Sequence, residues 1–421
     1  MSIFYCKKCL NPSNHPLGIF FDKMGVCSGC LVHEEKYSIN WKKKINDLRL
    51  IFAKTRNKNT YYDCIIPING NGDDFYVVHF AKKILKIRPL LVSYNNHFNS
   101  KIGIRNTARL ISKLDCDHIS MTLNPEIVKK ITSVCFETIN DIYWHVLAGN
   151  QAFPTQLAIK MKIPIILWGV NGWLDQVGKF SHHHNVQMTK RIWEEFSLRN
   201  LKIEKIIKKT NLNYKNFAPL IYPDLKEIYK NNLIGIYLGN YILWDAKNQT
   251  EEMIKLYEYE TISQERTHNK YESIYCKINA GTHDLIKLLK HGYGKVTDHI
   301  NRDIRFKRIS RTEGMYIVKK YQKKMPDDLG VFLDWLKISK KLFFDTFAKY
   351  NFFKEKNNKL IFLKKDNLYN HLKPKTVDEI NLIEKKLNYI QTSNLEKDLP
   401  SEKFIIFGRT YMDEKNFRAV E

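Results

Sequence analysis

The sequence predicts an α/β protein built around a doubly wound parallel sheet. Between residues 63 and 170, apolar runs of six to eight residues alternate with segments of helical pattern. Such runs are typical of strands covered by helices on both faces. The first run ends in the turn NGNGDD, which contains only Asn, Gly and Asp. In a doubly wound sheet this turn lies at the carboxyl edge of the strands, where these folds bind their ligands.

The individual strands and helices follow from the same patterns. Residues 185–345 are predicted to be mostly helical, with one strand at 233–239 and a capping box, SRTE, that starts a helix at Ser310. The residues after 345 are rich in Lys, Asn and Glu and contain two short apolar runs, KLIFL and KFIIFG. For the sheet we expect strands over 63–68, 88–94, 116–123 and 163–170, and helices over 75–86, 103–114 and within 125–160.

The first 35 residues differ from the rest because they contain two Cys-x-x-Cys pairs. Each pair forms a turn that directs two thiolates to one point, and two such turns complete a tetrahedral zinc site. Four protein ligands leave no open coordination position, so the expected zinc is structural, and free thiols are the alternative. The predicted ligands are Cys6, Cys9, Cys27 and Cys30.

These patterns divide the chain into four predicted units. A zinc ribbon is followed by a nucleotide-binding α/β domain, and a Lys-rich helical segment links the two. A helical substrate-binding region with one or more added strands comes next, and a small appendage ends the chain. The predicted boundaries are 1–35, 36–180, 181–345 and 346–421.

The chain is strongly basic, with 69 Lys and Arg residues against 44 Asp and Glu residues and a net charge of +25. An anionic partner such as a nucleotide, nucleotide-sugar, nucleic acid or membrane surface is one explanation, and lysine-rich usage without a binding role is the other. No signal peptide is visible, and the longest apolar run, LIGIYLGNYILW, is too short to span a bilayer. We therefore expect a cytoplasmic protein, whose eight cysteines are metal ligands or buried thiols rather than disulfides.

The NGNGDD turn is the first candidate binding site. Gly70 and Gly72 permit positive φ and the close approach of a phosphate, and Asn71 tolerates the same backbone conformation. Asp73 and Asp74 suit the N-terminus of the following helix, which is a purely structural explanation. As a single motif, the sequence is also ordinary turn chemistry.

A second candidate is the segment KHGYGKVTDHINRDIRFKRISRTEG, which is dense in Arg, Lys and His. In a helix over 296–306, Asp298 and Arg302 lie one turn apart and can pair with each other. The alternative is an arginine cluster that binds phosphate groups bidentately, with GYG allowing close approach of the backbone. The residues of that candidate site are Gly292, Gly294, Lys295, Arg302, Arg305, Arg308 and Arg311.

Taken in order, these segments resemble the N-acetyl sugar amidotransferase family, whose PseA- and WbpG-like members serve pseudaminic acid and lipopolysaccharide O-antigen biosynthesis. The resemblance runs from Tyr5 to about Lys340. The matching segments are YCKKCL with FDKMGVCSGC, CIIPINGNGDDFY, RPLLVSYNN, LNPEIVKK, FPTQLAIK, IILWGVN, IYLGNYILWD and GYGKVTDHINRDIRFKRISRTEG.

The resemblance implies a PP-loop ATP pyrophosphatase domain with the adenine nucleotide α-hydrolase (HUP-like) fold. It also implies a reaction in which ATP, with Mg²⁺, adenylates the acetamido oxygen of an N-acetyl sugar and releases pyrophosphate. Ammonia from a separate glutaminase subunit then displaces AMP and leaves an acetamidino group. The implied catalytic residues are Asp73, Asp245 and Arg305, and the implied nucleotide-binding residues are Asn69, Gly70, Asn71, Gly72, Asp73, Asp74, Trp168, Gly169 and Asn171 together with the basic segment.

The sequence departs from the family pattern in two places. The family's pyrophosphate loop reads Ser-Gly-Gly-Lys-Asp-Ser, so this chain lacks the Lys and both hydroxyls and gains a carboxylate at Asp74. Val170 stands where the family's Trp-Gly-Glu-Asn sequence has Glu. We predict that the turn keeps the shape of a phosphate cradle but binds ATP weakly, unless Mg²⁺ bridges its carboxylates.

Two alternative functions remain open. The first is a catalytically impaired paralogue that binds a sugar nucleotide or a partner protein. The second is a tRNA-modifying PP-loop enzyme, because such enzymes also join zinc knuckles to this fold and suit a basic surface. The segments LGNYILWD and GYGKVTDHINRDIR resemble the sugar family, so a nucleic-acid partner is not expected.

Overall fold

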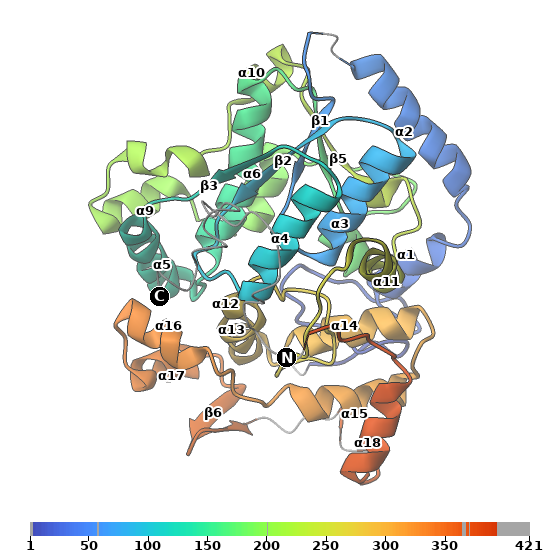
Figure 1. Cartoon of the computed structure of the whole chain (residues 1–421). Helices are drawn as coiled ribbons and strands as arrows, with labels where there is room; N and C mark the ends of the chain where they lie inside the picture. The colour runs from blue at the N-terminus through green and yellow to red at the C-terminus, as the bar shows by residue number, and fades with distance from the viewer. Residues whose placement is uncertain (1–2, 57–58, 200, 364–367, 370, 394–421) are drawn as a thin grey trace, which may run out of the picture.

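The computed structural model of the chain describes residues 3–56, 59–199, 201–363, 368–369 and 371–393. Its centre is a five-stranded parallel sheet of order β3-β2-β1-β4-β5 (Figure 1). The strand order reverses between β1 and β4, so the predicted doubly wound sheet is confirmed. The strands are β1 (Cys64–Pro67), β2 (Pro89–Tyr94), β3 (His118–Met121), β4 (Ile165–Trp168) and β5 (Ile234–Tyr237).

The fifth strand comes from the segment that follows the predicted domain boundary at residue 180. Ile165 of β4 lies opposite Ile234, and Trp168 lies opposite Tyr237, in a parallel pairing. The segment assigned to a separate helical region therefore supplies the edge strand of the main sheet. It ends at the same carboxyl edge as the other four strands.

Helices cover both faces of the sheet (Figure 1). On one face, Cys64 and Ile66 of β1 pack in a core with α3 (Gly72–His79), α4 (Lys101–Lys113), α11 (Ala246–Tyr257) and α2 (Trp41–Thr55). On the other face, Ile65 packs in a core with α6 (Trp144–Lys160). Neighbouring residues of one strand are thus buried on opposite faces, which explains the unbroken apolar runs in the sequence.

The remaining helices lie along the predicted segments, with small shifts at their ends. The helix expected over 75–86 is α3 followed by one wider turn at Phe80–Ile84. The predicted capping box is confirmed, because Ser310 accepts a hydrogen bond from the backbone of Glu313 and donates its own N–H to that side chain. The other helices are α1 (Ser28–Glu35), α5 (Pro125–Ile139), α7 (Gly172–Asp175), α8 (Lys190–Ile192), α9 (Ile203–Thr210), α10 (Leu225–Lys230), α12 (Lys277–Ala280), α13 (Thr282–His291), α14 (Lys295–Arg305), α15 (Arg311–Tyr321), α16 (Leu329–Leu336), α17 (Lys340–Ala348) and α18 (Val377–Lys385).

The N-terminal cysteine-rich unit packs against the carboxyl-terminal half of the chain. Its four cysteines and Leu10 share a hydrophobic core with Val296 and Ile300 of α14 and Met315 of α15. The backbone N–H of Leu10 also donates to the side chain of Asn301, at 2.7 Å. This unit is therefore held beside the segment that carries the predicted arginine cluster.

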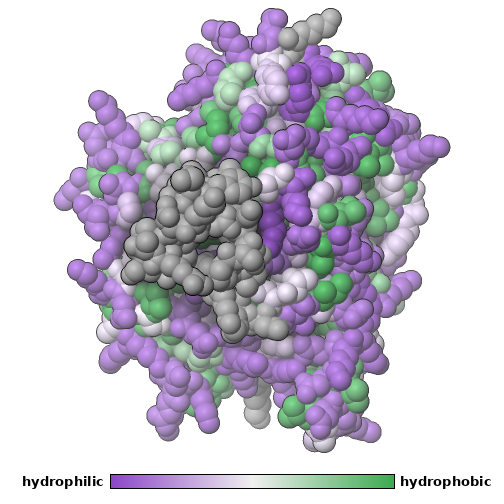
Figure 2. Space-filling view, viewed as in Figure 1, coloured by the Kyte–Doolittle hydropathy of each residue, from purple (hydrophilic) through white to green (hydrophobic). Residues whose placement is uncertain are grey.

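The last described elements of the chain are a two-stranded hairpin and one helix, α18. KLIFL forms β7 (Lys359–Phe362), which pairs antiparallel with β6 (Phe353–Lys356), whereas KFIIFG lies outside the described residues. Figure 2 shows mainly hydrophilic residues on one face, with hydrophobic ones scattered among them, as expected for a strongly charged chain. Among the described helices, none has both the length and the apolar character needed to cross a membrane.

Candidate functional site at the carboxyl edge of the sheet

A pocket of about 180 Å³ lies where the strand order reverses, and we call it the switch-point crevice. It is formed by the carboxyl ends of β1, β2 and β4, the NGNGDD turn and one residue of α6. This is the position at which doubly wound sheets bind ligands. Its polar and aromatic lining comes from Asn69, Asn71, Asp73, Tyr94, Asn150 and Trp168.

The two glycines of the turn are required for different structural reasons. Gly70 has a φ of 88°, and a Cβ atom there would lie 2.6 Å from the hydroxyl of Thr107. Gly72 does not have positive φ; a Cβ atom there would lie 2.5 Å from the hydroxyl of Thr250 on α11. Of the two glycines that permit positive φ, only Gly70 adopts it, whereas Gly72 is needed for close helix packing. Asn71 has an ordinary φ of −85°.

The backbone donors of the turn all point to one atom of the same chain. The Oδ2 atom of Asp74 accepts hydrogen bonds from the backbone N–H groups of Asn69, Gly70 and Asn71, at 2.7, 2.8 and 2.9 Å. Burial raises the pKa of Asp74 to about 6, although the three donors act in the opposite direction. The turn thus has the predicted shape of an anion cradle, and its anion is an internal carboxylate.

Asp73, the neighbouring carboxyl group, faces the crevice without a partner. Its Oδ1 atom is buried and has no hydrogen bond within the described part of the chain. Burial, with a further contribution from the carboxylate of Glu272, raises the pKa of Asp73 to about 8. This raised pKa favours the protonated form of Asp73, which can donate a hydrogen bond into the crevice.

The turn after β4 contributes only part of its predicted set. Trp168 and Gly169 line the crevice, and the indole N–H of Trp168 is buried without a partner among the described residues. Asn171 begins α7 instead, where its side chain accepts a hydrogen bond from the backbone of Trp173 at 3.0 Å. Asn171 does not line the crevice.

Within the basic segment, Arg302 is the arginine whose charge influences Asp73 in the NGNGDD turn. It donates two hydrogen bonds to Glu272, at 2.7 and 2.6 Å, and its charge opposes the rise in the pKa of Asp73. The backbone N–H of Ser273 donates to the side chain of Asn71 at 3.2 Å. The predicted pairing of Arg302 with Asp298 is wrong, because Asp298 pairs with Lys287.

The other three arginines do not form one anion site with Arg302. Arg305 donates to two backbone carbonyls at the end of α7, those of Asp175 and Gln176, both at 2.9 Å. The Nη2 atom of Arg308 donates to both carboxylate oxygens of Asp245, at 2.5 Å each. Arg311 donates to the backbone carbonyls within the first cysteine pair, both at 3.0 Å. Each guanidinium therefore joins two segments of the protein in this structure.

The GYG sequence also approaches an internal carboxylate. The backbone N–H of Lys295 donates to Asp284 at 2.6 Å, and a Cβ atom at Gly294 would lie 3.2 Å from the same carboxylate. The ammonium group of Lys295 donates to the side chain and carbonyl of Asn279. Gly292, with a φ of 81°, ends α13. None of these three predicted site residues lines the switch-point crevice.

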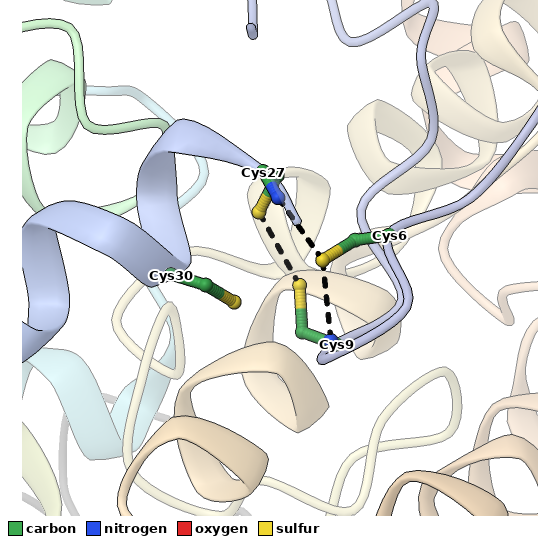
Figure 3. Close-up of side chains that lie close together, drawn as sticks. All are labelled: Cys6, Cys9, Cys27 and Cys30. Atoms are coloured by element: carbon green, nitrogen blue, oxygen red, sulfur yellow. Dashed lines mark hydrogen bonds between the residues drawn. The ribbon is translucent and has the colours of Figure 1, made fainter. Parts of the chain in front are cut away.

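The four predicted zinc ligands converge on one point (Figure 3). All four are buried, and their Sγ atoms lie within 4.8 Å of one another. The Sγ atoms of Cys9 and Cys27 are 3.6 Å apart, close to the roughly 3.8 Å that tetrahedral geometry with Zn–S bonds of about 2.3 Å requires. Backbone N–H groups donate to the sulfurs, as at 3.2 Å from Cys27 to Cys6. This donor set fits a structural zinc ion.

Two residues that line the crevice, Tyr94 and Asn150, and one that acts on Asp73 from outside it, Glu272, were not predicted from the sequence. Tyr94 ends β2 at the carboxyl edge, so the argument used for the NGNGDD turn applies to it as well. Asn150 is a polar residue of α6 that lines the crevice at the carboxyl edge of the sheet. Glu272 carries no local signal, because only the folded chain brings it near Asp73.

The fold and this crevice define a doubly wound α/β protein with a candidate ligand site at its switch point. Residues 265–374 match the family described as LPS biosynthesis protein WbpG-like, C-terminal domain. No curated protein matches the chain. The solved structure of NMN synthetase from Francisella tularensis is similar at 11% identity and a TM-score of 0.25, covering 52% of this chain and 96% of that chain. A TM-score of that size carries no argument about the fold, which rests on the sheet order.

Proposed function

We propose that this chain acts on an N-acetyl sugar, free or linked to a nucleotide, in the assembly of a surface polysaccharide, an O-antigen or a flagellin glycan. The observation that carries the proposal is the contact between the WbpG-like segment and the switch-point crevice. Ser273 of that segment donates to Asn71 in the turn, and Glu272 and Arg302 act on Asp73. A segment matched to polysaccharide biosynthesis thus lies against the crevice.

The first candidate reaction is ATP-dependent amidotransfer. ATP would activate the acetamido oxygen as an adenylate, and ammonia from a separate glutaminase subunit would replace AMP to give an acetamidino group. As the turn stands, pyrophosphate does not fit it, because Asp74 occupies the three N–H donors that a phosphate would use. The residues assigned to this reaction therefore concern the sugar: Asp73 donates a proton or hydrogen bond, and Asn71 and Asn150 orient polar groups.

The second candidate is a catalytically impaired paralogue that binds the sugar without activating it. The position of Asp74 favours this candidate, because a carboxylate in the turn competes with the anion that the reaction requires. Asp245 and Arg308 also pair with each other, so they stabilise the fold in this structure rather than await a ligand.

One experiment separates the two candidates. The purified chain is incubated with ATP, Mg²⁺, ammonia and N-acetyl hexosamines or their nucleotide-linked forms, and released pyrophosphate is measured. The sugar is then examined for the small mass decrease that accompanies replacement of oxygen by NH. Both signals together establish amidotransfer. Binding of the same sugars is measured in parallel by saturation-transfer NMR. Sugar binding without pyrophosphate release or a mass change establishes the second candidate, and the absence of both binding and turnover rejects both candidates.

We also propose one structural zinc ion at the four cysteines. The zinc would fix the first 35 residues against α14 and α15. Because all four ligands come from the protein, the ion would have no open position for substrate.

A further inference from the structure

We propose that the switch-point crevice binds one uncharged polar group of about the size of a sugar ring, and that Asp74 closes the adjoining turn to phosphate. The assignment of a sugar rests on the proposed function. The exclusion of phosphate rests on the geometry of the turn alone. The two parts can therefore be tested separately.

The charges around the crevice disfavour an anion. Among the described residues that line it, none is Lys, Arg or His, and two, Asp73 and Asp74, carry carboxyl groups. A phosphate in the crevice would meet the carboxylate of Asp74 without a lining cation to offset its charge. The guanidinium of Arg302, whose charge reaches Asp73, is already paired with Glu272. An uncharged ligand avoids this repulsion.

The size of the crevice points in the same direction. Its volume is about 180 Å³, whereas sites for drug-sized ligands typically span roughly 300 to 1,000 Å³. A complete nucleotide is a ligand of the size that such larger sites bind, whereas a single sugar ring needs less space. The neighbouring turn cannot extend the site for phosphate, because the carboxylate of Asp74 occupies it.

The lining supplies partners for hydroxyl and acetamido groups. Two buried polar atoms, Oδ1 of Asp73 and Nε1 of Trp168, have no hydrogen-bond partner in the described chain. Buried polar groups are normally hydrogen-bonded, so these two atoms mark positions for ligand or water. Asn69 and Asn150 add amide groups that both donate and accept, and Trp168 and Tyr94 add aromatic surface. Polar groups on a partly aromatic wall suit a sugar ring.

The sugar is tested by saturation-transfer NMR with N-acetylglucosamine, N-acetylgalactosamine and N-acetylmannosamine as probes. We expect at least one of them to receive saturation from the protein. Asn150→Ala should weaken that binding at least about fivefold, because it removes a crevice amide. Asn46→Ala, on the exposed face of α2, is the matched control and should leave the binding unchanged. Transfer to none of the three sugars, or transfer that Asn150→Ala does not lower, would overturn the sugar assignment.

The closed turn is tested by calorimetry with pyrophosphate, and with ATP and Mg²⁺. We expect no measurable binding by the natural chain and an increase of at least about tenfold in pyrophosphate affinity for Asp74→Ser, which frees three N–H donors. If that variant does not fold, Asp74→Asn retains the shape and removes the charge. Tight binding by the natural chain that neither variant strengthens would show that Asp74 does not close the turn.

These results are distinguishable from failure of the proposed function. Sugar binding that depends on Asn150, without pyrophosphate release in the turnover assay, supports the crevice and rejects amidotransfer. Turnover that is unaffected by Asn150→Ala rejects the crevice as the sugar site and leaves amidotransfer standing.

Discussion

The carboxylate of Asp74 lies 2.8 Å from the backbone nitrogen of Gly70, inside the turn that precedes its own helix. A carboxylate at this helix N-terminus is stabilised both by the N–H groups and by the helix dipole. Both effects would otherwise be available to a phosphate. The carboxylate of Asp74 therefore satisfies the N–H groups of the turn from within the chain.

Gly72 should tolerate no side chain, because Thr250 of α11 packs against its α-carbon. Gly72→Ala is expected to destabilise the chain by about 1–3 kcal/mol, as overpacking typically does. Gly172→Ala is the matched control, since Gly172 also follows an Asn and begins a helix but has open space at the Cβ position. Thermal unfolding of the two variants measures the difference. Equal melting temperatures would contradict the contact with Thr250.

Asp73 should make the stability of the chain depend on pH. Its pKa is about 8 in the folded chain against an ordinary value of 3.8. A raised folded pKa gives stability that is fully present below about pH 4 and is lost as the pH rises through about 8. Asp73→Asn removes this loss, so its Tm relative to the natural chain should be higher at pH 9 than at pH 6, by about 2 °C or more. Asp115→Asn, at a fully exposed carboxylate, should show no such trend.

The four-cysteine cluster should hold about one zinc ion per chain. Elemental analysis of protein purified without chelator measures the ion directly. Cys27→Ser should lose the zinc and lower the melting temperature, because the ribbon packs against α14. Cys116→Ser, outside the cluster, should retain it. Zinc-free natural protein would show that the cysteines are free thiols.

The pair of Arg302 and Glu272 should be important for stability near the crevice. Removing one partner of a buried pair costs roughly 3–5 kcal/mol. The two side chains are 17% and 27% exposed, so we expect about 2 kcal/mol for Arg302→Met. Adding Glu272→Gln should recover part of that loss, because it removes the unpaired carboxylate. Additive losses in a double-mutant cycle would mean that the pair contributes no coupling.

The sheet and the cysteine cluster were predictable because their signals are local. An apolar run identifies a strand that is buried on both faces, and two Cys-x-x-Cys pairs identify a cluster without knowledge of the fold. The arginine cluster was not predictable in the same way. Helical spacing places Arg302 and Arg305 near one another, but their partners, Glu272 and the carbonyl of Gln176, come from distant parts of the chain.

The contacts of the NGNGDD turn also could not be predicted from the sequence alone. Its glycine and asparagine content predicted a cradle, and Asp74 was expected near the helix N-terminus. Which anion the cradle holds depends on a side-chain rotamer and on the position of α11, which composition does not specify. The need for Gly72 likewise comes from Thr250, a residue far along the chain.

The most direct test of the account is a crystal structure of the chain grown with an N-acetyl hexosamine, ATP and Mg²⁺ together. The account predicts sugar density in the switch-point crevice beside Asp73 and Trp168, with the carboxylate of Asp74 still bound to the N–H groups of residues 69–71. Phosphate density at those N–H groups, with Asp74 turned away and no sugar in the crevice, would contradict it.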